Sequence, residues 1–177
     1  MSYPLITERL SIEPLSENAL SEFISYRQDP DVARYQGWDI SYSRSDALEL
    51  LHSQKDVMVP SSGNWLQLGI HNRESGELLG DLALHCLENQ EHAFEIGFTL
   101  SKLNQGKGIA KEAADRLIRY LFAEVGAKVV IANCDERNIS AANLLLSLGF
   151  KQLSEKSWTE NFKNELVTMN FYEKVPS

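Results

Sequence analysis

Gln105-Gly106-Lys107-Gly108-Ile109-Ala110 is the stretch that decides the fold. It joins an alternating apolar segment at 93–100 to the most regular amphipathic pattern of the chain, which predicts a helix ended by Gly126. The next segment, 128–134, is apolar at both parities, which is typical of a central strand covered on both faces. Strand, glycine turn, helix and strand in this order predict a right-handed crossover between parallel strands. The apolar face of the helix comprises Ile109, Ala110, Ala113, Ala114, Leu117, Ile118, Leu121, Phe122 and Val125.

Upstream of this unit the pattern has period two. Residues 65–70 and 78–87 flank the turn residues 72–76, which predicts a hairpin, and residues 93–100 extend it to an antiparallel meander. Gly97 within the third segment indicates a bulge or a close backbone approach.

The N-terminal third predicts one strand followed by helices. Residues 10–14 alternate and stop at a proline, which favours an edge strand. Leu20, Phe23 and Ile24 share one helical face, and Asp29-Pro30 ends that helix and starts a short second one. Ser43 and Asp46 form a predicted capping box for a third helix, whose inner face is Ala47, Leu48 and Leu51.

Downstream, a helix is expected over 139–148, closed by Gly149-Phe150, with strands at 151–154 and 166–175. Neither repeats nor a break in composition divide the 177 residues, so we expect a single domain over 1–177.

Composition narrows the class of function. The net charge is −8, from 25 acidic and 17 basic residues, and the bases are scattered, so direct nucleic-acid binding is not expected. No apolar run could cross a bilayer and the first ten residues lack a secretory pattern, so we expect a cytoplasmic protein without membrane contact. Cys86 and Cys134 are expected to be reduced, and the four histidines lack partners at ligand spacing, so no metal is predicted.

The glycine turn precedes a helix N-terminus, where free N–H groups and the helix dipole favour an anion. A P-loop needs GxxxxGK followed by Ser or Thr, which is absent. A dinucleotide fingerprint needs a third glycine or a small residue where Lys111 stands. The pyrophosphate of another ligand remains, as does a helix cap made for structural reasons.

Gln105, Gly108 and Ala110 resemble the acetyl-CoA motif of the GNAT superfamily of N-acetyltransferases, Gln/Arg-x-x-Gly-x-Gly/Ala. The segment 95–100 is similar to that family's splayed fourth strand, and Asn138, Ala141 and residues 148–150 to its Asn-x-x-Ala and Leu-Gly-Phe segment. The opening residues 7–10, with Asp29-Pro30-Asp31-Val32, look like the branch that acetylates ribosomal-protein N-termini, the ribosomal-protein-alanine type.

The resemblance implies an α/β (α+β) fold: a mixed, mostly antiparallel sheet of about seven strands with helices on both faces. It also implies acetyl-CoA as cosubstrate. The cofactor-binding residues that it implies are Phe98, Leu100, Gln105, Gly106, Lys107, Gly108, Ile109, Ala110, Asn138 and Asn143. For Asn138 a helix N-cap is the alternative role, and both can hold together.

Transfer of an acetyl group to an amine requires a neutral nucleophile, a polarised thioester carbonyl and an acid for the departing thiolate. Glu95, beside the expected bulge, is the candidate base, and a solvated or salt-bridged strand glutamate is the alternative. A backbone N–H near Phe98 could polarise the carbonyl.

The positions that could supply the acid for the thiolate differ from the pattern of the family that this chain resembles. Leu145 stands where many relatives have Tyr, and Ala141 where the ribosomal branch often has Ser. Ser140 is the candidate in their place, with Tyr172 as a further possibility. The absence of the Tyr and the Ser leaves open a second function, a non-catalytic acyl-CoA-binding or regulatory module.

The acceptor is expected to be a small-molecule or peptide amine: a protein N-terminus, an amino acid, a polyamine or an aminoglycoside. Its binding loops are expected at 36–42 and 57–64. A monomer and a homodimer remain equally open.

Overall fold

The computed structural model describes residues 3–177, which form one nine-stranded sheet with the order β1-β2-β3-β4-β5-β6-β9-β7, β8 also pairing with β9. All neighbouring strands are antiparallel except β5 and β6. This mixed α/β architecture confirms the predicted fold class. The strands are β1 Leu5–Ile6, β2 Leu10–Pro14, β3 Trp65–Asn72, β4 Leu78–Cys86, β5 Ala93–Leu100, β6 Val129–Asp135, β7 Lys151–Gln152, β8 Trp158–Phe162 and β9 Glu165–Lys174.

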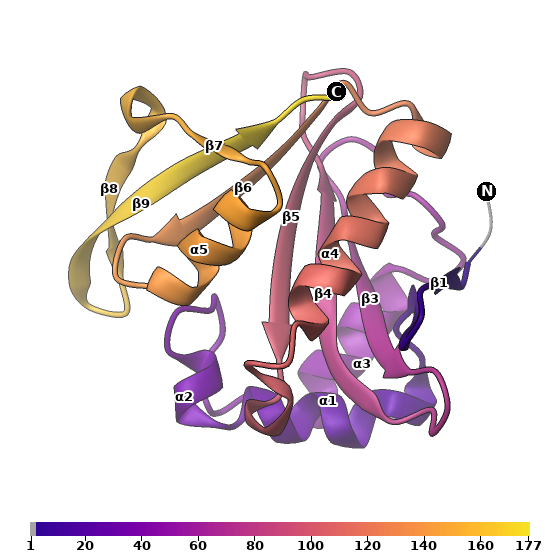
Figure 1. The fold of residues 1–177 in the computed structure, drawn as a ribbon. Helices are drawn as coiled ribbons and strands as arrows, with labels where there is room; N and C mark the ends of the chain where they lie inside the picture. Colours follow the sequence, from indigo (N-terminus) through magenta and orange to yellow (C-terminus); the bar gives the residue numbers. More distant parts are fainter. Residues whose placement is uncertain (1–2) are drawn as a thin grey trace.

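Helices cover both faces of the sheet (Figure 1). α4 and α5 lie on the face turned to the viewer, and α1 and α3 lie behind. In the described residues, no helix is both long and apolar enough for a bilayer. The helices are α1 Leu20–Arg27, α2 Pro30–Ala33, α3 Arg44–Ser53, α4 Ile109–Tyr120 and α5 Ile139–Ser147, with a π-helical turn Leu121–Val125 and short 3₁₀ turns at Glu17–Ala19, Lys102–Asn104 and Ser154–Lys156.

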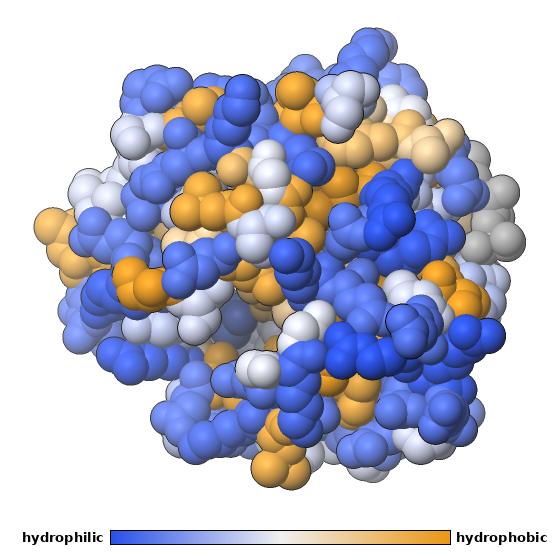
Figure 2. Space-filling model, in the orientation of Figure 1, coloured by the Kyte–Doolittle hydropathy of each residue, from blue (hydrophilic) through white to orange (hydrophobic). Residues whose placement is uncertain are grey.

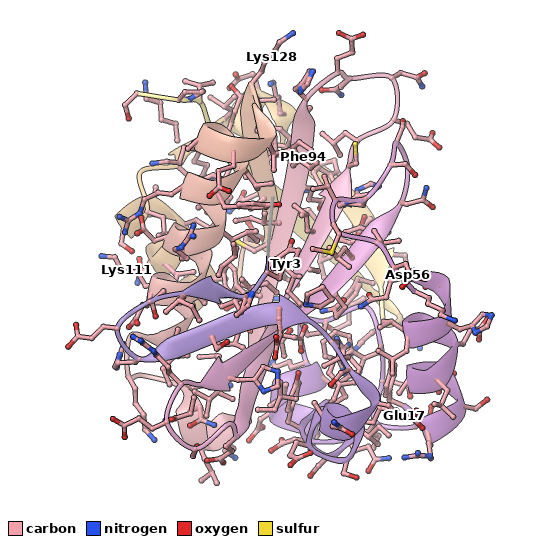
Figure 3. The ribbon with its side chains drawn as sticks, turned by 90° about the vertical axis from the view of Figure 1, so that its right-hand side faces the viewer. Tyr3, Glu17, Asp56, Phe94, Lys111 and Lys128 are labelled. Carbon is pink, nitrogen blue, oxygen red and sulfur yellow. The ribbon has the colours of Figure 1, made fainter. Side chains whose placement is uncertain are left out.

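The main core lies between α4 and the sheet. Ala113, Ala114 and Leu117 are completely buried there against strand residues such as Leu82 and Phe94. In Figure 3, Phe94 lies on the sheet beside α4, whereas Lys111 projects from the first turn of that helix on the side away from the sheet. The apolar face predicted for α4 is therefore correct, and it is the face that packs on the sheet.

A second core joins α1 and α3 to the other face of the sheet. It contains Phe23 and Leu20, and beside it Arg27 forms an ion pair with the buried Asp81 of β4 at 3.3 Å. Gln67 and Tyr26 also donate hydrogen bonds to Asp81, so this buried carboxylate is fully paired. The acidic side chain thereby anchors α1 to the middle of the sheet.

The parallel pairing between β5 and β6 is short. β5 pairs with β6 only from Ala93 to Glu95, opposite Val129 to Ile131, whereas β6 continues beside β9 as far as Asp135. Beyond Glu95 the two strands separate. The ends that diverge are the ones that lead into α4 and α5.

Several expectations were wrong in detail. β1 lies outside β2, so residues 10–14 are not the sheet edge, and β8 was not predicted. β5 keeps a continuous register with β4 through Gly97, so no bulge occurs against that neighbour, and the register shift lies at Ile70/His71. Leu48 is 39% exposed because the inner face of α3 is carried instead by Ala47, Leu50 and Leu51.

Candidate active site

The turn between β5 and α4 has two glycines in the left-handed region. Gly106 has φ 73° and Gly108, the N-cap of α4, has φ 76°. Left-handed backbone favours glycine at both positions because a Cβ would crowd the carbonyl. The next residue, Ile109, is buried in the main core and holds the first turn of α4 against the sheet. The two glycines therefore let the chain reverse directly into a helix start.

The N–H groups of this turn are free. Within residues 3–177, no protein acceptor takes a hydrogen bond from the backbone N–H of residues 106–110. A Cβ built on Gly106 would meet no atom within 4 Å, and one on Gly108 only Arg9, at 3.5 Å. Among residues 3–177, no side chain fills the space at Gly106 and only Arg9 approaches Gly108, so the residues of the turn fit an anionic group such as a diphosphate.

The carbonyl groups of the turn are held by side chains. Gln105 Nε2 donates to the carbonyl of Leu100 at 3.2 Å, and Arg9 Nη1 donates to that of Lys107 at 3.0 Å. The side chain of Gln105 therefore braces the turn from inside, which the sequence motif did not indicate.

The second helix start of the site is that of α5. Asn138 caps it by accepting from the N–H of Ala141 at 3.2 Å, as the alternative role predicted. Ser140 and Asn143 are exposed on the first two turns of α5. Figure 2 shows a recess in the molecular surface, in the region where Figure 1 places the beginnings of α4 and α5.

Glu95 lies where β5 and β6 begin to separate. Phe94 and Ile96 pack into the α4 core, and side chains alternate along a strand, so Glu95 points to the opposite face. His85 Nδ1 of β4 lies 3.2 Å from its Oε2, and Asn133 Nδ2 of β6 donates to its Oε1 at 3.0 Å. The side chain of Glu95 is 23% exposed, so the carboxylate is oriented and still reachable.

Residues on four neighbouring strands form one row on this face. The indole of Trp65 stacks on His85 with ring centroids 4.3 Å apart and an interplanar angle of 5°. Trp65, His85 and Glu95 are register partners across β3, β4 and β5. The sequence reasoning missed His85 and Asn133, although aligning 78–87 antiparallel to 93–100 would have placed His85 opposite Glu95. Asn133 Oδ1 is buried without a hydrogen-bond partner in the described residues.

No acid for the thiolate is evident from the contacts. Leu145 and Ala141 are buried in the core, and Ser140 makes no side-chain hydrogen bond in the described part of the chain. Tyr172 is only 1% exposed, and burial together with the neighbouring Cys134 raises the pKa of its hydroxyl. Tyr172 therefore has the environment of a core residue.

A cavity of about 390 Å³ lies between α2, the following loop and the β8–β9 turn, and its lining contains no residue of the row. Asn133 and Asp135 are two residues apart on β6 and share a face, and Arg137 binds Asp135 at 2.7 Å and Glu165 at 2.7 Å. Hydrogen bonds from Arg137 lower the pKa of Asp135. The cavity lining includes part of the expected loop 36–42 but none of 57–64: Pro30, Ala33, Arg34, Asp39, Ile40, Arg137, Phe162, Lys163 and Glu165.

Residues 9–151 match the family model of the acetyltransferase (GNAT) domain. The chain belongs to the GNAT family. It is an acetyl-CoA-dependent N-acetyltransferase, as the glycine turn led us to expect.

Curated and solved relatives agree with this assignment. An uncharacterized N-acetyltransferase of Bacillus licheniformis, p20, is 25% identical over 168 residues, which cover 95% of this chain and 93% of the relative. Among solved structures, a GNAT acetyltransferase from Bacillus anthracis superposes with a TM-score of 0.83 at 22% identity, covering 96% of both chains. Spermidine N-acetyltransferase from Vibrio cholerae, solved with CoA and spermine, has a TM-score of 0.81 at 15% identity and the same coverage of both chains.

Proposed function

We propose that this GNAT protein transfers the acetyl group of acetyl-CoA directly to a primary amine, with Glu95 as the general base. The observation that carries the proposal is the combination of two features: the N–H groups of residues 106–110, which have no acceptor within residues 3–177, and an oriented carboxylate at the separation of β5 and β6. One group of residues would hold the cofactor and the other would take the proton of the amine.

Acetyl-CoA would supply the thioester that is attacked. We propose that the N–H groups of residues 106–110 bind its diphosphate, and that the unpaired side of β5 from Phe98 to Leu100 hydrogen-bonds its pantetheine arm like an added strand. Asn138 and Asn143, at the start of α5, are proposed as further contacts of that arm. Ser140 remains the proposed proton donor to the thiolate because it is exposed on the first turn of α5.

The base has a defined task. A primary ammonium has an ordinary pKa of roughly 8 to 10, so it must lose a proton before it can attack. The carboxylate of Glu95 accepts that proton directly or through one water, while His85 and Asn133 hold its two oxygens. The alternative role, a salt-bridged strand glutamate, would require a protonated His85, because no Lys or Arg forms an ion pair with Glu95 among the described residues.

The acceptor is proposed to be an amine of low molecular mass or a peptide N-terminus, seated in the 390 Å³ cavity. Two relatives with named acceptors support the amine class: the Vibrio cholerae enzyme acts on spermidine, and an Aspergillus fumigatus relative, 25% identical over 155 residues, is an FsC-acetyl coenzyme A-N(2)-transacetylase. The ribosomal-protein-alanine type is also proposed, on the opening residues 7–10 together with residues 29–32.

The test of the base is Glu95→Gln, which keeps the shape and removes the basic carboxylate. We expect turnover to fall by roughly 10²-fold with CoA affinity nearly unchanged, measured by thiol release with an amine panel and by calorimetry. Glu91→Gln, in the exposed β4–β5 loop, is the control and should act like the wild type. Unchanged turnover in Glu95→Gln would remove this residue from the mechanism.

One observation favours a second function. Leu145 and Ala141 leave the thiolate side of the site apolar, which suits a protein that binds acyl-CoA without efficient chemistry. Such a binder would be stabilised thermally by CoA yet release no free thiol with any amine.

A further inference from the structure

We propose that Arg9 is a positioning residue that turns the N–H of Gly108 toward the diphosphate of acetyl-CoA. This inference rests on the proposed cofactor site. Arg9 lies in the link between β1 and β2, a part of the chain that is remote in sequence from the glycine turn, and no motif of the turn includes it.

The guanidinium of Arg9 is fixed by two partners. Its Nε donates to Glu112 Oε2 at 2.7 Å and its Nη2 lies 2.6 Å from the same oxygen, while Nη1 donates to the carbonyl of Lys107 at 3.0 Å. The other oxygen of Glu112 accepts from Thr7 Oγ1 at 2.5 Å and from the backbone N–H of Arg9 at 3.1 Å. Burial would raise the pKa of Glu112, but these hydrogen bonds outweigh it and hold the pKa below its ordinary value. Glu112 therefore stays ionised and keeps the fork of Arg9 in place.

The geometry of the peptide unit gives this contact a consequence for the ligand. In a trans peptide the C=O of Lys107 and the N–H of Gly108 point in opposite directions. Because Arg9 holds the C=O on its own side of the turn, the N–H of Gly108 must point to the other side. Glycine at 108 has no Cβ to restrict φ, so the contact with Arg9 adds a constraint on this peptide plane that the residue itself does not supply.

The direction is the one that a ligand between the helix starts requires. β1 lies on the side of α4 that faces away from α5 (Figure 1), so Arg9 approaches the turn from that side. The N–H of Gly108 is thereby turned toward the side of α5, where Figure 2 shows the recess. Arg9 also carries a charge that Glu112 neutralises, so its effect on the ligand is one of orientation.

The experiment measures dissociation constants by calorimetry for three probes: CoA, 3′-dephospho-CoA and pantetheine, which lacks the diphosphate. For Arg9→Gln we expect the Kd of CoA and of 3′-dephospho-CoA to rise about tenfold each, the effect of one misdirected hydrogen bond to a charged group, and that of pantetheine to stay unchanged. Arg9→Lys should be as weak as Arg9→Gln, because an ammonium cannot bridge Glu112 and the carbonyl of Lys107 as the planar fork does.

The control is Arg73→Gln. Arg73 donates to the carbonyl of Thr7 at 3.2 Å in the same neighbourhood but does not touch the turn, so its Kd values should equal those of the wild type. Equal weakening of pantetheine would mean general damage to the fold and would overturn the proposal. If Arg9→Gln weakened CoA but not 3′-dephospho-CoA, Arg9 would contact the 3′-phosphate directly. If Arg9→Lys bound CoA like the wild type, the role of Arg9 would be purely electrostatic. Either result would overturn the proposal. A wild type without CoA affinity would instead refute the proposed function itself.

Discussion

The carboxylate of Glu95 is held from both neighbouring strands. A carboxylate only accepts hydrogen bonds, so the contact with His85 requires the proton on Nδ1, and the stacked indole of Trp65 fixes the imidazole plane. Asn133 holds the second oxygen from β6. A base held in this way loses little entropy when it meets the amine, which is the advantage of a preorganised site.

Substitution of His85 tests this support. We expect His85→Ala to lower kcat about tenfold, because a hydrogen bond to a charged group is lost, while KM for acetyl-CoA stays unchanged. His85→Asn, whose Nδ2 can stand where Nδ1 stood, should retain most of the turnover. If the Asn variant were as slow as the Ala variant, His85 would act by exchanging the proton and not by holding Glu95.

The residues of the site were only partly predictable. Glu95, Asn138 and the glycine turn lie within local motifs, so the sequence could indicate them without any tertiary knowledge. His85, Asn133 and Arg9 reach the site through strand pairing and through the β1–β2 link, and their sequence separation from their partners is 10, 38 and 98 residues. All three were missed, and only the position of His85 could have been obtained from a hairpin register.

At the scale of elements, the glycine turn and α4 act as one structural unit that presents free N–H groups. The helix is pinned by its buried face, and the turn before it leaves its amides free because both glycines adopt positive φ. Gly126 has a matching φ of 77° at the other end of the helix unit, where a Cβ would also meet no atom within 4 Å. Two positions with the same local strain thus lie at opposite ends of one unit.

We expect Gly106→Ala and Gly126→Ala to lower the free energy of unfolding equally, by about 1 kcal/mol each, since both force a Cβ into the left-handed region. Only Gly106→Ala should weaken CoA, by tenfold or more, because its methyl group would occupy the open space before the free amides. Chemical denaturation and calorimetry measure the two effects. Equal CoA affinity in both variants would contradict the placement of the diphosphate at this turn.

Elements with a strong internal period were predicted close to their true bounds. The strand expected at 93–100 is β5, and the capping box of Ser43 and Asp46 is present at the start of α3. β1 has two residues and pairs with β2 alone, and β8 is polar and largely exposed, so neither carries an apolar period that a sequence could display. Their pairing is decided by the sheet that they join and not by their own composition.

At the scale of the whole molecule, segments that are remote in sequence, within 30–40 and 162–165, line the cavity proposed for the acceptor together. Lys163, in the β8–β9 turn, donates through Nζ to the carbonyl of Trp38 at 2.7 Å and to that of Ala33. These contacts join a C-terminal hairpin to the segment after α2, across 125 and 130 residues of sequence. Loss of hydration lowers the pKa of Lys163, which Asp39 partly opposes. Lys163 therefore ties two walls of the cavity together.

We expect Lys163→Ala to raise KM for the acceptor amine several-fold and to leave KM for acetyl-CoA unchanged, because the hairpin would be free to move away from α2 while the cofactor turn is untouched. Steady-state kinetics with the best amine of a panel measures both constants. Lys156→Ala is the matched control. Lys156 lies in the 3₁₀ turn before β8 and pairs with Glu173 of β9 at 3.1 Å, but it does not line the cavity, so neither constant should change. If KM for acetyl-CoA rose by the same factor, the hairpin would support the whole site. That result would contradict a specific role of the cavity in acceptor binding.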